Sequence, residues 1–349
     1  MDILIVKLSA IGDVIHTLPA LNAIRKHYAR ARITWLVEEE AAGLIAGHPA
    51  LDRVIVSRRK RWAKGILRKG CLKMIKESYR FIRELRDTRY DLVIDFHGLL
   101  KSGLLIGLSK GKRKVGFGKG MEHAEYSHLF LNERVPAVDM EIHALTRNMM
   151  LVRALGIPAD EIAYRLPVGE QERRLVAELL VRCGDQGSKT LVAINPVAKW
   201  ATKLWSNAKF AELADRLIAE HDALIVFTGS QSDRNVIARI GSLMKREATN
   251  LAGEMNLKTL AALYERTGVA VVTDTGPMHL AAASGTPVVA LFGPTAPWRT
   301  GPFGSGHQVV RIGLECSPCF KRQCPSSIEC MEEISVEQVL DGILKLGIL

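Results

Sequence analysis

With 349 residues, the chain exceeds the usual size of a single hydrophobic core, which predicts two domains. A hydrophobic content of 48% and a charged content of 24% exclude large-scale disorder, and no apolar run reaches the length of a membrane span. The start MDILIVKLS lacks the pattern of a signal peptide, so we expect an intracellular protein.

The positive charge is concentrated in the first half of the chain. The formal net charge is +11; residues 1–165 hold 29 Lys/Arg and 18 Asp/Glu, which leaves 19 of each for the remainder. Within that half, residues 57–90 carry 13 basic and 3 acidic side chains. Such a run indicates an anionic partner, such as an acidic glycolipid, a membrane surface or nucleic acid.

This basic stretch has two parts, which we interpret differently. For residues 75–89 we favour a solvated amphipathic helix, because apolar residues recur at helical spacing and need basic residues on the other face. The recurring apolar residues are Ile75, Tyr79, Ile82 and Leu85. For residues 58–64, in which Trp62 is embedded, we favour binding of the anionic partner.

Apolar runs of strand length alternate with helical patterns along the chain, which is typical of parallel β/α architecture. In the first half the expected strands are 2–7, 33–38, 91–95 and 114–117, and the expected helices are 13–28, 73–88 and 140–155. In the second half the expected strands are 190–195, 223–228, 269–274 and 287–293, with helices beginning near 206, 232 and 276.

This alternation predicts an α/β fold of two Rossmann-like, doubly wound domains that face each other across a cleft. We place the domains at 1–165 and 188–334, joined by the polar stretch between them. The pattern alone does not place a closing helix at 335–346. Ligands of open α/β sheets bind outside the carboxyl ends of the strands, so the residues that follow each strand are the candidates for the functional site.

The first strand leads into KLSAIGDVIHTLPAL, residues 7–21. Many nucleotide-binding proteins have a glycine-rich phosphate loop at this turn, but here the turn carries only Gly12, followed by the carboxylate of Asp13. The start of a helix favours an ionised carboxylate. Asp13 is therefore a candidate for taking up a proton, for capping the helix, or for both.

A later strand of the first half leads into VIDFHGLLKSGLLIG, residues 93–107. Asp95, His97, Gly98 and Lys101 follow the strand and are candidates for the same face as the basic stretch. Taken alone this signal is weak, because a single histidine is more often structural.

The first strand of the second half leads into INPVAKWATKLWSNAKF, residues 194–210. Pro196 and two tryptophans predict a rigid, irregular loop, and Lys199, Thr202 and Lys203 supply two cations and a hydroxyl. A lysine beside a diphosphate stabilises the charge that builds up as the diphosphate departs. The alternative is that these lysines are only solvated.

The stretch VAVVTDTGPMHLAAASGTPVVALFGPT, residues 269–295, combines a buried strand with a helix start. Asp274, Thr275, Gly276 and His279 lie within six residues, with Pro277 at a position that the first turn tolerates. A helix start with free N–H groups, a hydroxyl and a glycine suits a pyrophosphate. The alternative, Thr275 as a helix cap and His279 as a structural histidine, does not explain the clustering.

Four of the six cysteines cluster in CSPCFKRQCPSSIEC, as Cys316, Cys319, Cys324 and Cys330. The spacing is compatible with a structural zinc or iron–sulfur site, but we favour free thiols or an adventitious disulfide, and the chemistry does not need a metal.

KLSAIGDVIHTLPAL, DFHGLLKS, NPVAKWATKLW and DTGPMHLAAASGTPVVALFGPT, in this order and spacing, resemble the lipopolysaccharide heptosyltransferases, the ADP-heptose-using family 9 glycosyltransferases of Gram-negative bacteria. The resemblance covers nearly the whole chain. HTLPAL, RRKRW and HGLLKS look most like the heptosyltransferase I branch, which acts on Kdo-lipid A. The family has the two-domain GT-B fold, which implies that the final helix, 335–349, packs back on the first domain.

The resemblance implies an inverting transfer of heptose from ADP-heptose to Kdo of the lipid A inner core, by a cytoplasmic protein peripheral to the inner membrane, without metal or cofactor. The implied catalytic residues are Asp13, as base, and Lys203, at the donor diphosphate. The implied donor-binding residues are Asp274, Thr275, Gly276, His279, Thr202, Lys199, Met255 and Gln231. The implied acceptor-binding residues are Lys7, Ser9, Arg59, Lys60, Arg61, Lys64, His97 and Lys101.

The chain departs from the family pattern in two places. Val197 and Ala198 replace a Thr-Thr pair of the heptosyltransferase I branch, and Gln231 replaces a glutamate expected near the ribose. These departures bear on the acceptor, so transfer onto the first heptose, as by a heptosyltransferase II, is the alternative.

Three other functions can be distinguished from a heptosyltransferase. A nucleotide-sugar epimerase would release or rearrange its sugar without an acceptor. A nucleic-acid-binding module rests on the basic stretch alone, and we expect no nucleic-acid partner. A dinucleotide dehydrogenase is disfavoured because no G-x-G-x-x-G follows the first strand.

Overall fold

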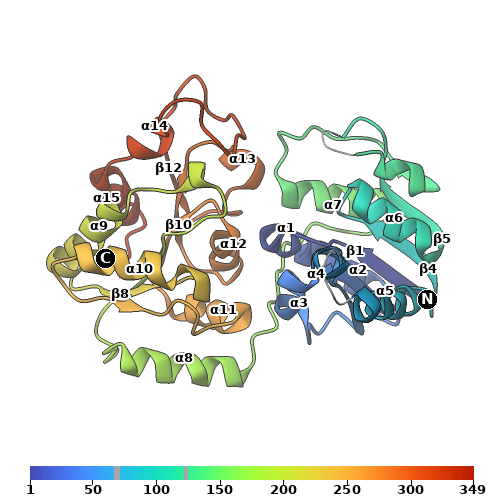
Figure 1. Cartoon of the computed structure of the whole chain (residues 1–349), viewed down its shortest axis with the longest axis horizontal. Helices are drawn as coiled ribbons and strands as arrows, with labels where there is room; N and C mark the ends of the chain where they lie inside the picture. The colour runs from blue at the N-terminus through green and yellow to red at the C-terminus, as the bar shows by residue number, and fades with distance from the viewer. Residues whose placement is uncertain (67–70, 122–124) are drawn as a thin grey trace. The chain divides into compact units, whose positions relative to one another are not determined.

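The chain folds into two compact units, Met1–Pro167 and Val168–Leu349. The computed structural model describes residues 1–66, 71–121 and 125–349, with side chains described outside residues 64–71. Figure 1 colours the first unit from blue to green and the second from green to red. From the sequence, we place the two domains at 1–165 and 188–334.

The first unit is built on a parallel sheet of six described strands in the order β3-β2-β1-β4-β5-β6. The strands are β1 (Asp2–Val6), β2 (Arg32–Glu38), β3 (Arg53–Ser57), β4 (Arg89–Asp95), β5 (Lys110–Phe117) and β6 (Glu133–Val135). This order is that of a Rossmann sheet, in which the direction of winding reverses between β1 and β4. The sequence pattern missed β3 and β6, which are short edge elements.

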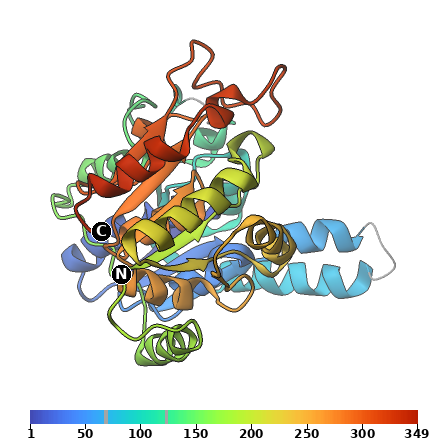
Figure 2. The same cartoon turned by 90° about the vertical axis from the view of Figure 1, so that its left-hand side faces the viewer.

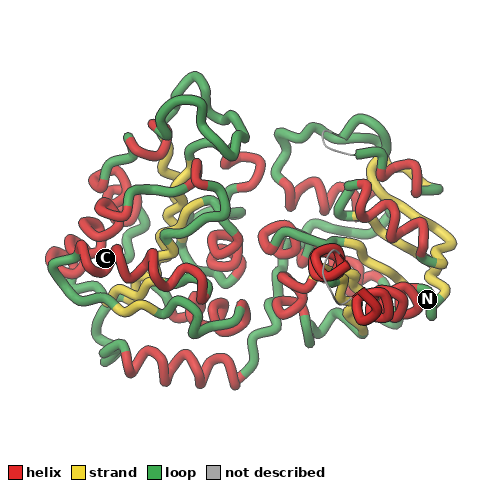
Figure 3. The backbone as a smooth tube through the Cα atoms, in the orientation of Figure 1, coloured by secondary structure: helices red, strands yellow, loops and turns green. Residues whose placement is uncertain are grey.

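Helices pack against this sheet and connect its strands (Figure 3). They are α1 (Ile11–Ile15), α2 (Leu18–His27), α3 (Glu39–Ile45), α4 (Arg59–Ile66), α5 (Cys71–Leu85), α6 (Leu100–Leu108), η1 (Ser127–Phe130) and α7 (Ala144–Ala154). The expected helix 13–28 is two helices. Thr17 is the N-cap of α2 and Pro19 lies in its first turn, where the missing N–H costs no helix hydrogen bond.

The second unit repeats the same topology, with the order β12-β11-β10-β7-β8-β9 in its described strands. The strands are β7 (Leu191–Asn195), β8 (Leu224–Phe227), β9 (Thr249–Asn250), β10 (Val269–Thr273), β11 (Val288–Phe292) and β12 (Gln308–Arg311). All pairs are parallel, and winding reverses between β7 and β10. The chain therefore contains two Rossmann-like, doubly wound units.

The helices of the second unit follow each strand in turn. They are α8 (Glu170–Arg182), η2 (Ala201–Lys203), α9 (Asn207–His221), η3 (Gln231–Asp233), α10 (Arg234–Leu243), α11 (Leu257–Arg266), α12 (Gly276–Ala283), α13 (Pro297–Thr300), α14 (Glu329–Glu332) and α15 (Val336–Leu344). The stretch that we expected to join the domains, 165–188, contains α8, which packs on α11.

Each unit has its own hydrophobic core around its central strands. In the first, Leu4 and Val6 of β1 pack with Leu36 of β2 and Val93 of β4. In the second, the core spans the strands and the helices beside them, and β10 and β11 are buried along their whole length. Near-continuous apolar strands are expected of a parallel sheet that is covered on both faces. Among the described residues, no helix is long and apolar enough to cross a bilayer.

The prediction that the final helix packs on the first unit is wrong. Helix α15 lies on β11, β12 and α9 of the second unit. Its apolar face, which includes Val339 and Ile343, is buried in the second core together with Val289 and Leu291. Gly342 lies on this packed face, where a Cβ would be in van der Waals contact with Val289 and Val310, 3.4 Å from a side-chain atom of each. The β11–β12 face of its own sheet is thus where this helix buries its apolar face.

Candidate functional site

Four loops with candidate residues lie at the carboxyl ends of the strands that flank the switch point of each sheet. In the first unit, the Asp13 loop follows β1 and the His97 loop follows β4. In the second unit, the Lys203 loop follows β7 and the Asp274 loop follows β10. Loops on the two sides of a switch point diverge and leave a crevice, which is where open α/β sheets bind ligands.

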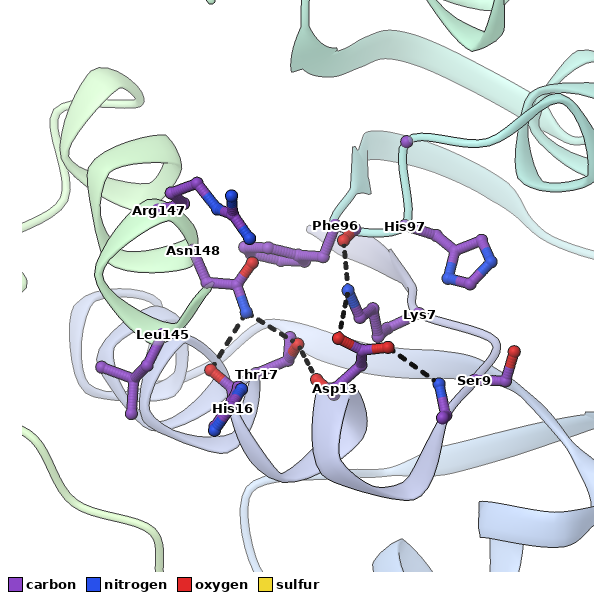
Figure 4. Close-up of polar contacts among 12 residues, drawn as sticks. Lys7, Ser9, Asp13, His16, Thr17, Phe96, His97, Leu145, Arg147 and Asn148 are labelled. Atoms are coloured by element: carbon purple, nitrogen blue, oxygen red, sulfur yellow. Dashed lines mark hydrogen bonds and ion pairs between the residues drawn. The ribbon is translucent and has the colours of Figure 1, made fainter. Parts of the chain in front are cut away.

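Asp13 both caps its helix and presents a carboxylate oxygen to solvent. Its Oδ2 accepts a hydrogen bond from the Ala10 backbone N–H at 3.0 Å, from the third position of α1 (Figure 4). This contact satisfies a backbone donor at the start of the helix. The side chain is nevertheless 44% exposed. Asp13 therefore acts as a cap from inside the helix through Oδ2, while its other oxygen, Oδ1, lies on the side of Lys7.

Lys7 is buried next to Asp13. Its Nζ donates to the Phe96 carbonyl oxygen at 2.8 Å and lies 3.9 Å from Asp13 Oδ1 (Figure 4). Only 8% of the residue is exposed. This burial does not fit the expected direct contact with the acceptor. The structure instead makes Lys7 a fixed positive charge beside the Asp13 carboxylate.

Ser9 and Lys101 are brought together from opposite sides of the switch point. Lys101 Nζ donates to Ser9 Oγ at 3.0 Å, and it also lies 3.7 Å from Glu38 Oε1. Burial lowers the pKa of Lys101, and the nearby Glu38 carboxylate partly opposes this effect. Glu38, at the end of β2, is itself buried.

The cations at the start of α4 are paired with carboxylates of the chain itself. Glu38 forms ion pairs with Arg59 at 3.4 Å and Lys60 at 3.3 Å, and Lys60 also contacts Glu40 at 2.9 Å. The hydrogen bond to Glu40 raises the pKa of Lys60. Since Arg59 and Lys60 remain half-exposed, they stay accessible to a ligand that competes with these carboxylates.

The rest of that expected binding segment is less open. Arg61 pairs with Glu77 at 3.6 Å. Trp62 is buried, donates its Nε1–H to Glu77 at 3.2 Å, and packs on Phe81 with ring centroids 5.1 Å apart. Trp62 is thus a core residue and not a binding residue. Lys64 lies outside the residues whose side chains the structure describes.

The loop after β4 places a neutral histidine among cations. Burial lowers the pKa of His97 to about 2, with further contributions from the charges of Lys7, Lys101 and Arg59. Its two ring nitrogens are buried and have no hydrogen-bond partner among the described residues. A neutral imidazole can donate from one nitrogen and accept at the other, so His97 is equipped to bind a hydroxyl or a carboxylate.

Asp95 supports this loop and is not available to a ligand. It is buried, its Oδ1 accepts from the backbone N–H groups of His97 at 2.9 Å and Gly98 at 3.0 Å, and its Oδ2 accepts from Ser102 at 3.2 Å. Burial raises the pKa of Asp95, and these hydrogen bonds oppose the effect. Gly98 adopts a φ of 71°, which suits a residue without a Cβ.

In the second unit, Lys203 and Asp274 form a buried ion pair. Lys203 Nζ lies 2.5 Å from Asp274 Oδ2 and 4.5 Å above the centre of the Trp200 ring. The hydroxyl of Thr295 donates to the same Asp274 oxygen at 2.6 Å. The carboxylate therefore has two partners that fix its orientation at the end of β10.

The start of α12 lies directly after this carboxylate. Thr275 is the N-cap in extended conformation, and its hydroxyl donates to the Thr273 carbonyl at 3.3 Å without capping the helix. Gly276 is the first helical residue, Pro277 lies beside it in the first turn, and His279 is buried in the same turn. N–H groups at such a helix start attract anions.

Two candidates on the loop after β7 differ in position. Thr202 is buried and donates its hydroxyl to the Lys321 carbonyl at 2.9 Å. This contact gives Thr202 a structural role, contrary to the expected contact with the donor. Lys199 is exposed, as a cation that meets a soluble ligand must be.

The remaining two candidates meet at Gly253. Gln231, at the end of β8, lies so close to Gly253 that a Cβ there would be 2.0 Å from Gln231 Oε1. Gly253 has a φ of 82°, which few other residues adopt. Met255 follows two residues later and is half-buried. The structure therefore brings Gln231 and Met255 to adjoining strand ends, on the β8–β9 side of the sheet.

Comparison with known proteins identifies the family. The model described as "Glycosyltransferase family 9 (heptosyltransferase)" matches residues 78–328. The chain belongs to this family. This glycosyltransferase is 33% identical to lipopolysaccharide heptosyltransferase 1 of Pseudomonas aeruginosa over 327 residues, which cover 93% of this chain and 87% of the relative.

Two further comparisons bear on the acceptor and the fold. The glycosyltransferase is 24% identical to lipooligosaccharide heptosyltransferase 2 of Campylobacter jejuni, over 97% of this chain and 96% of the relative. It resembles the solved structure of E. coli heptosyltransferase WaaC with ADP, with a TM-score of 0.79, 25% identity, and coverage of 99% of this chain and 100% of that one.

The cysteine cluster of the glycosyltransferase contains free thiols. Cys316, Cys319, Cys324 and Cys330 are unpaired, as is Cys183. Burial raises the pKa of the Cys330 thiol, with smaller contributions from the other three. In the part of the chain that the structure describes, no three metal-ligating side chains are arranged to hold a metal ion.

Sequence reasoning missed two residues of the glycosyltransferase that organise its sites. Glu38 is read as the end of an apolar strand, and nothing local distinguishes it from the exposed Glu39 and Glu40. Thr295 lies in the motif that follows β11, one strand away from Asp274 in the sheet. Its position after a parallel strand next to β10 is the signal that could have identified it, because carboxyl ends of neighbouring parallel strands meet at one edge.

Proposed function

We propose that this glycosyltransferase transfers heptose from ADP-heptose to Kdo of the lipid A inner core, with inversion at the anomeric carbon. The observation that carries the proposal is the difference between the two switch points. That of the first unit presents an accessible carboxylate, Asp13, beside a buried cation. That of the second presents a lysine and a helix start, Lys203 and Gly276, which suit a diphosphate.

In this mechanism Asp13 takes the proton from the acceptor hydroxyl as the oxygen attacks the anomeric carbon. The bond between that carbon and the diphosphate oxygen breaks, and ADP departs with its electrons. Lys203 and the helix start at Thr275 and Gly276 stabilise the departing charge. His279, Lys199, Gln231 and Met255 are assigned to donor binding, with Asp274 nearest the sugar.

The acceptor would be bound by the first unit. Ser9, His97 and Lys101 supply hydrogen bonds to it. Arg59 and Lys60 supply positive charge, for which an acidic sugar competes with the carboxylates of Glu38 and Glu40. Arg61 is assigned to the same surface. Because lipid A is embedded in a bilayer, we propose that the enzyme works at the cytoplasmic face of the inner membrane. The 33% identity to the heptosyltransferase 1 of Pseudomonas aeruginosa supports Kdo as the acceptor residue.

The test is mass spectrometry of the product formed from purified protein, ADP-heptose and one of two acceptors. One acceptor is Kdo-lipid A, and the other already carries the first heptose. We expect one heptosyl increment on Kdo-lipid A alone. An increment only on the second acceptor would assign a heptosyltransferase II, and ADP release without any acceptor would indicate an epimerase or hydrolase.

A further inference from the structure

Helix α5 has one face in the protein core. Phe81 and Leu85 are buried against the first sheet, and Phe81 stacks on Trp62 of α4. The two helices contact each other and lie side by side, extending beyond the strands of the first unit (Figure 2). This packing fixes which way the rest of α5 points.

The opposite face of α5 carries an apolar stripe that no residue described by the structure covers. Leu72 is 85% exposed, Ile75 is 51% exposed and Tyr79 is 69% exposed. The spacing i, i+3, i+7 places the three side chains on one side of the helix. Scattered exposed apolar residues are normal, but three aligned on one short helix mark a surface that is buried by a partner. The exposure of Ile75 and Tyr79 also corrects our expectation that they form the buried face.

Four cations flank this stripe, and they differ from those of α4. Lys73, Lys76, Arg80 and Arg83 are all exposed. None of the four forms an ion pair with a residue that the structure describes, whereas the α4 cations are held by Glu38, Glu39, Glu40 and Glu77. The positive charge of the first half is therefore free on α5, where the sequence favoured a merely solvated helix.

We propose that the exposed face of α5 docks on an anionic lipid bilayer. The helix would lie in the plane of the interface, with Leu72, Ile75 and Tyr79 inserted at the boundary between headgroups and acyl chains and the four cations on anionic headgroups. An apolar stripe bordered by unpaired Lys and Arg is the composition of interfacial helices. With 15 residues, α5 is about 22 Å long, which suits lying on a membrane and not crossing it.

Charge complementarity selects the bilayer over a protein partner. Four unpaired cations beside three apolar groups match a surface that is anionic and apolar within a few ångströms, as a bilayer interface is. The proposal rests on the proposed function in one respect only, namely that a lipid acceptor gives the enzyme a reason to be at a membrane.

The experiment is cosedimentation of the full-length protein with vesicles. One set is phosphatidylcholine mixed with phosphatidylglycerol, and the other is phosphatidylcholine alone. We expect the wild-type protein to bind the mixed vesicles and to dissociate as salt is added. The variant Leu72→Ser/Ile75→Ser/Tyr79→Ser should lose this binding. Lys76→Gln and Arg80→Gln should each weaken it by about fivefold, the factor equivalent to the interaction of one cation with an anionic surface.

A matched control removes exposed apolar groups elsewhere. Val181→Ser/Leu243→Ser changes two exposed side chains of the second unit and should leave vesicle binding as in the wild type. Circular dichroism would confirm that the stripe variant is folded, and its transfer to a deacylated, water-soluble acceptor should be unchanged.

Two results would overturn the docking proposal. One is a wild-type protein that ignores anionic vesicles. The other is a stripe variant that binds them normally; if that variant also changes the molecular mass in solution, the stripe is a contact between copies of the chain. Failure of the proposed function is distinguishable, because it would appear as absence of heptosyl product with vesicle binding intact.

Discussion

The ammonium group of Lys7 lies 3.9 Å from the Asp13 carboxylate, and the Phe96 carbonyl holds it there through a 2.8 Å hydrogen bond. One member of this pair is buried and the other is accessible. The buried ammonium group is thus a fixed positive charge beside the accessible carboxylate. The pair also joins the two loops at the switch point, since Phe96 follows β4 and Lys7 follows β1.

Replacing Asp13 with Asn should abolish most turnover and leave the donor bound. An amide oxygen can still accept the Ala10 N–H bond, so the helix start is preserved, but the amide cannot take up the acceptor proton. We expect kcat to fall by roughly 10²–10⁴-fold, the usual contribution of a general base. Calorimetric titration with ADP-heptose should give a Kd close to that of the wild type. Retained turnover, or a large loss of donor affinity, would show that Asp13 is not the base.

Replacing Lys7 with Met should destabilise the fold and lower turnover. The replacement leaves the Phe96 carbonyl without its donor, which we expect to cost about 1–3 kcal/mol of unfolding free energy. It also removes the fixed positive charge beside Asp13, so we expect kcat of the folded variant to fall. Urea denaturation and steady-state kinetics measure the two effects, and a loss of stability with an unchanged kcat would mean that Lys7 only supports the fold.

His97 should stay neutral at every pH at which the enzyme works. Its pKa is about 2 in the folded protein and about 6.5 in an unfolded chain, so between these values only the unfolded chain binds the proton. The free energy of unfolding therefore falls as the pH drops below about 6.5, by up to about 1.4 kcal/mol per pH unit. The variant His97→Gln lacks this penalty.

Urea denaturation at two pH values measures the penalty. We compare the free energy of unfolding of His97→Gln with that of the wild type. This difference should be about 2 kcal/mol more in favour of the variant near pH 5 than near pH 7.5. The exposed His27 provides the control, and His27→Gln should show no such difference. Equal pH dependence in the wild type and His97→Gln would mean that His97 is protonated as readily when folded as when unfolded.

The sequence predicted the architecture well because long apolar strands and their spacing can be recognised from the local sequence, whatever they pack against. The expected strand 2–7 and the helix beginning near 276, for example, correspond to β1 and α12. The final helix was misplaced because its position was inferred from the family resemblance and not from the sequence pattern. An amphipathic pattern says that a helix covers a core without saying which one, and the packing of Ile343 with Val289 in the second core decides.

The candidate sites were predictable where residues lie close in sequence, as Asp274, Thr275 and Gly276 do. They were not predictable where a charge depends on a distant partner. Arg59 and Lys60 were expected to be free for an acceptor, but Glu38, more than twenty residues earlier in the chain, partly neutralises both. The exposure of a side chain was equally unpredictable. The periodicity of α5 reveals two apolar faces without showing that Tyr79 lies on the uncovered one.

Substitutions of Lys203 and Asp274 should have non-additive effects on the free energy of unfolding, whereas only Lys203 should be needed for its effect on turnover. Lys203→Met leaves the buried Asp274 carboxylate with Thr295 as its remaining side-chain partner, which we expect to cost about 3 kcal/mol of unfolding free energy. Adding Asp274→Asn removes the uncompensated charge, so the double variant should be more stable than the sum of the two single changes indicates. Urea denaturation of the four proteins gives this coupling energy.

Among these four proteins, kcat should not recover when stability does. If Lys203 stabilises the departing diphosphate, its loss lowers kcat by about 10²–10³-fold, and the second substitution cannot restore a missing positive charge. A folded but inactive double variant is therefore the expected result. Recovery of kcat together with stability would mean that Lys203 serves only to neutralise Asp274, and the charge that meets the diphosphate would then have to come from the helix start at Gly276 alone.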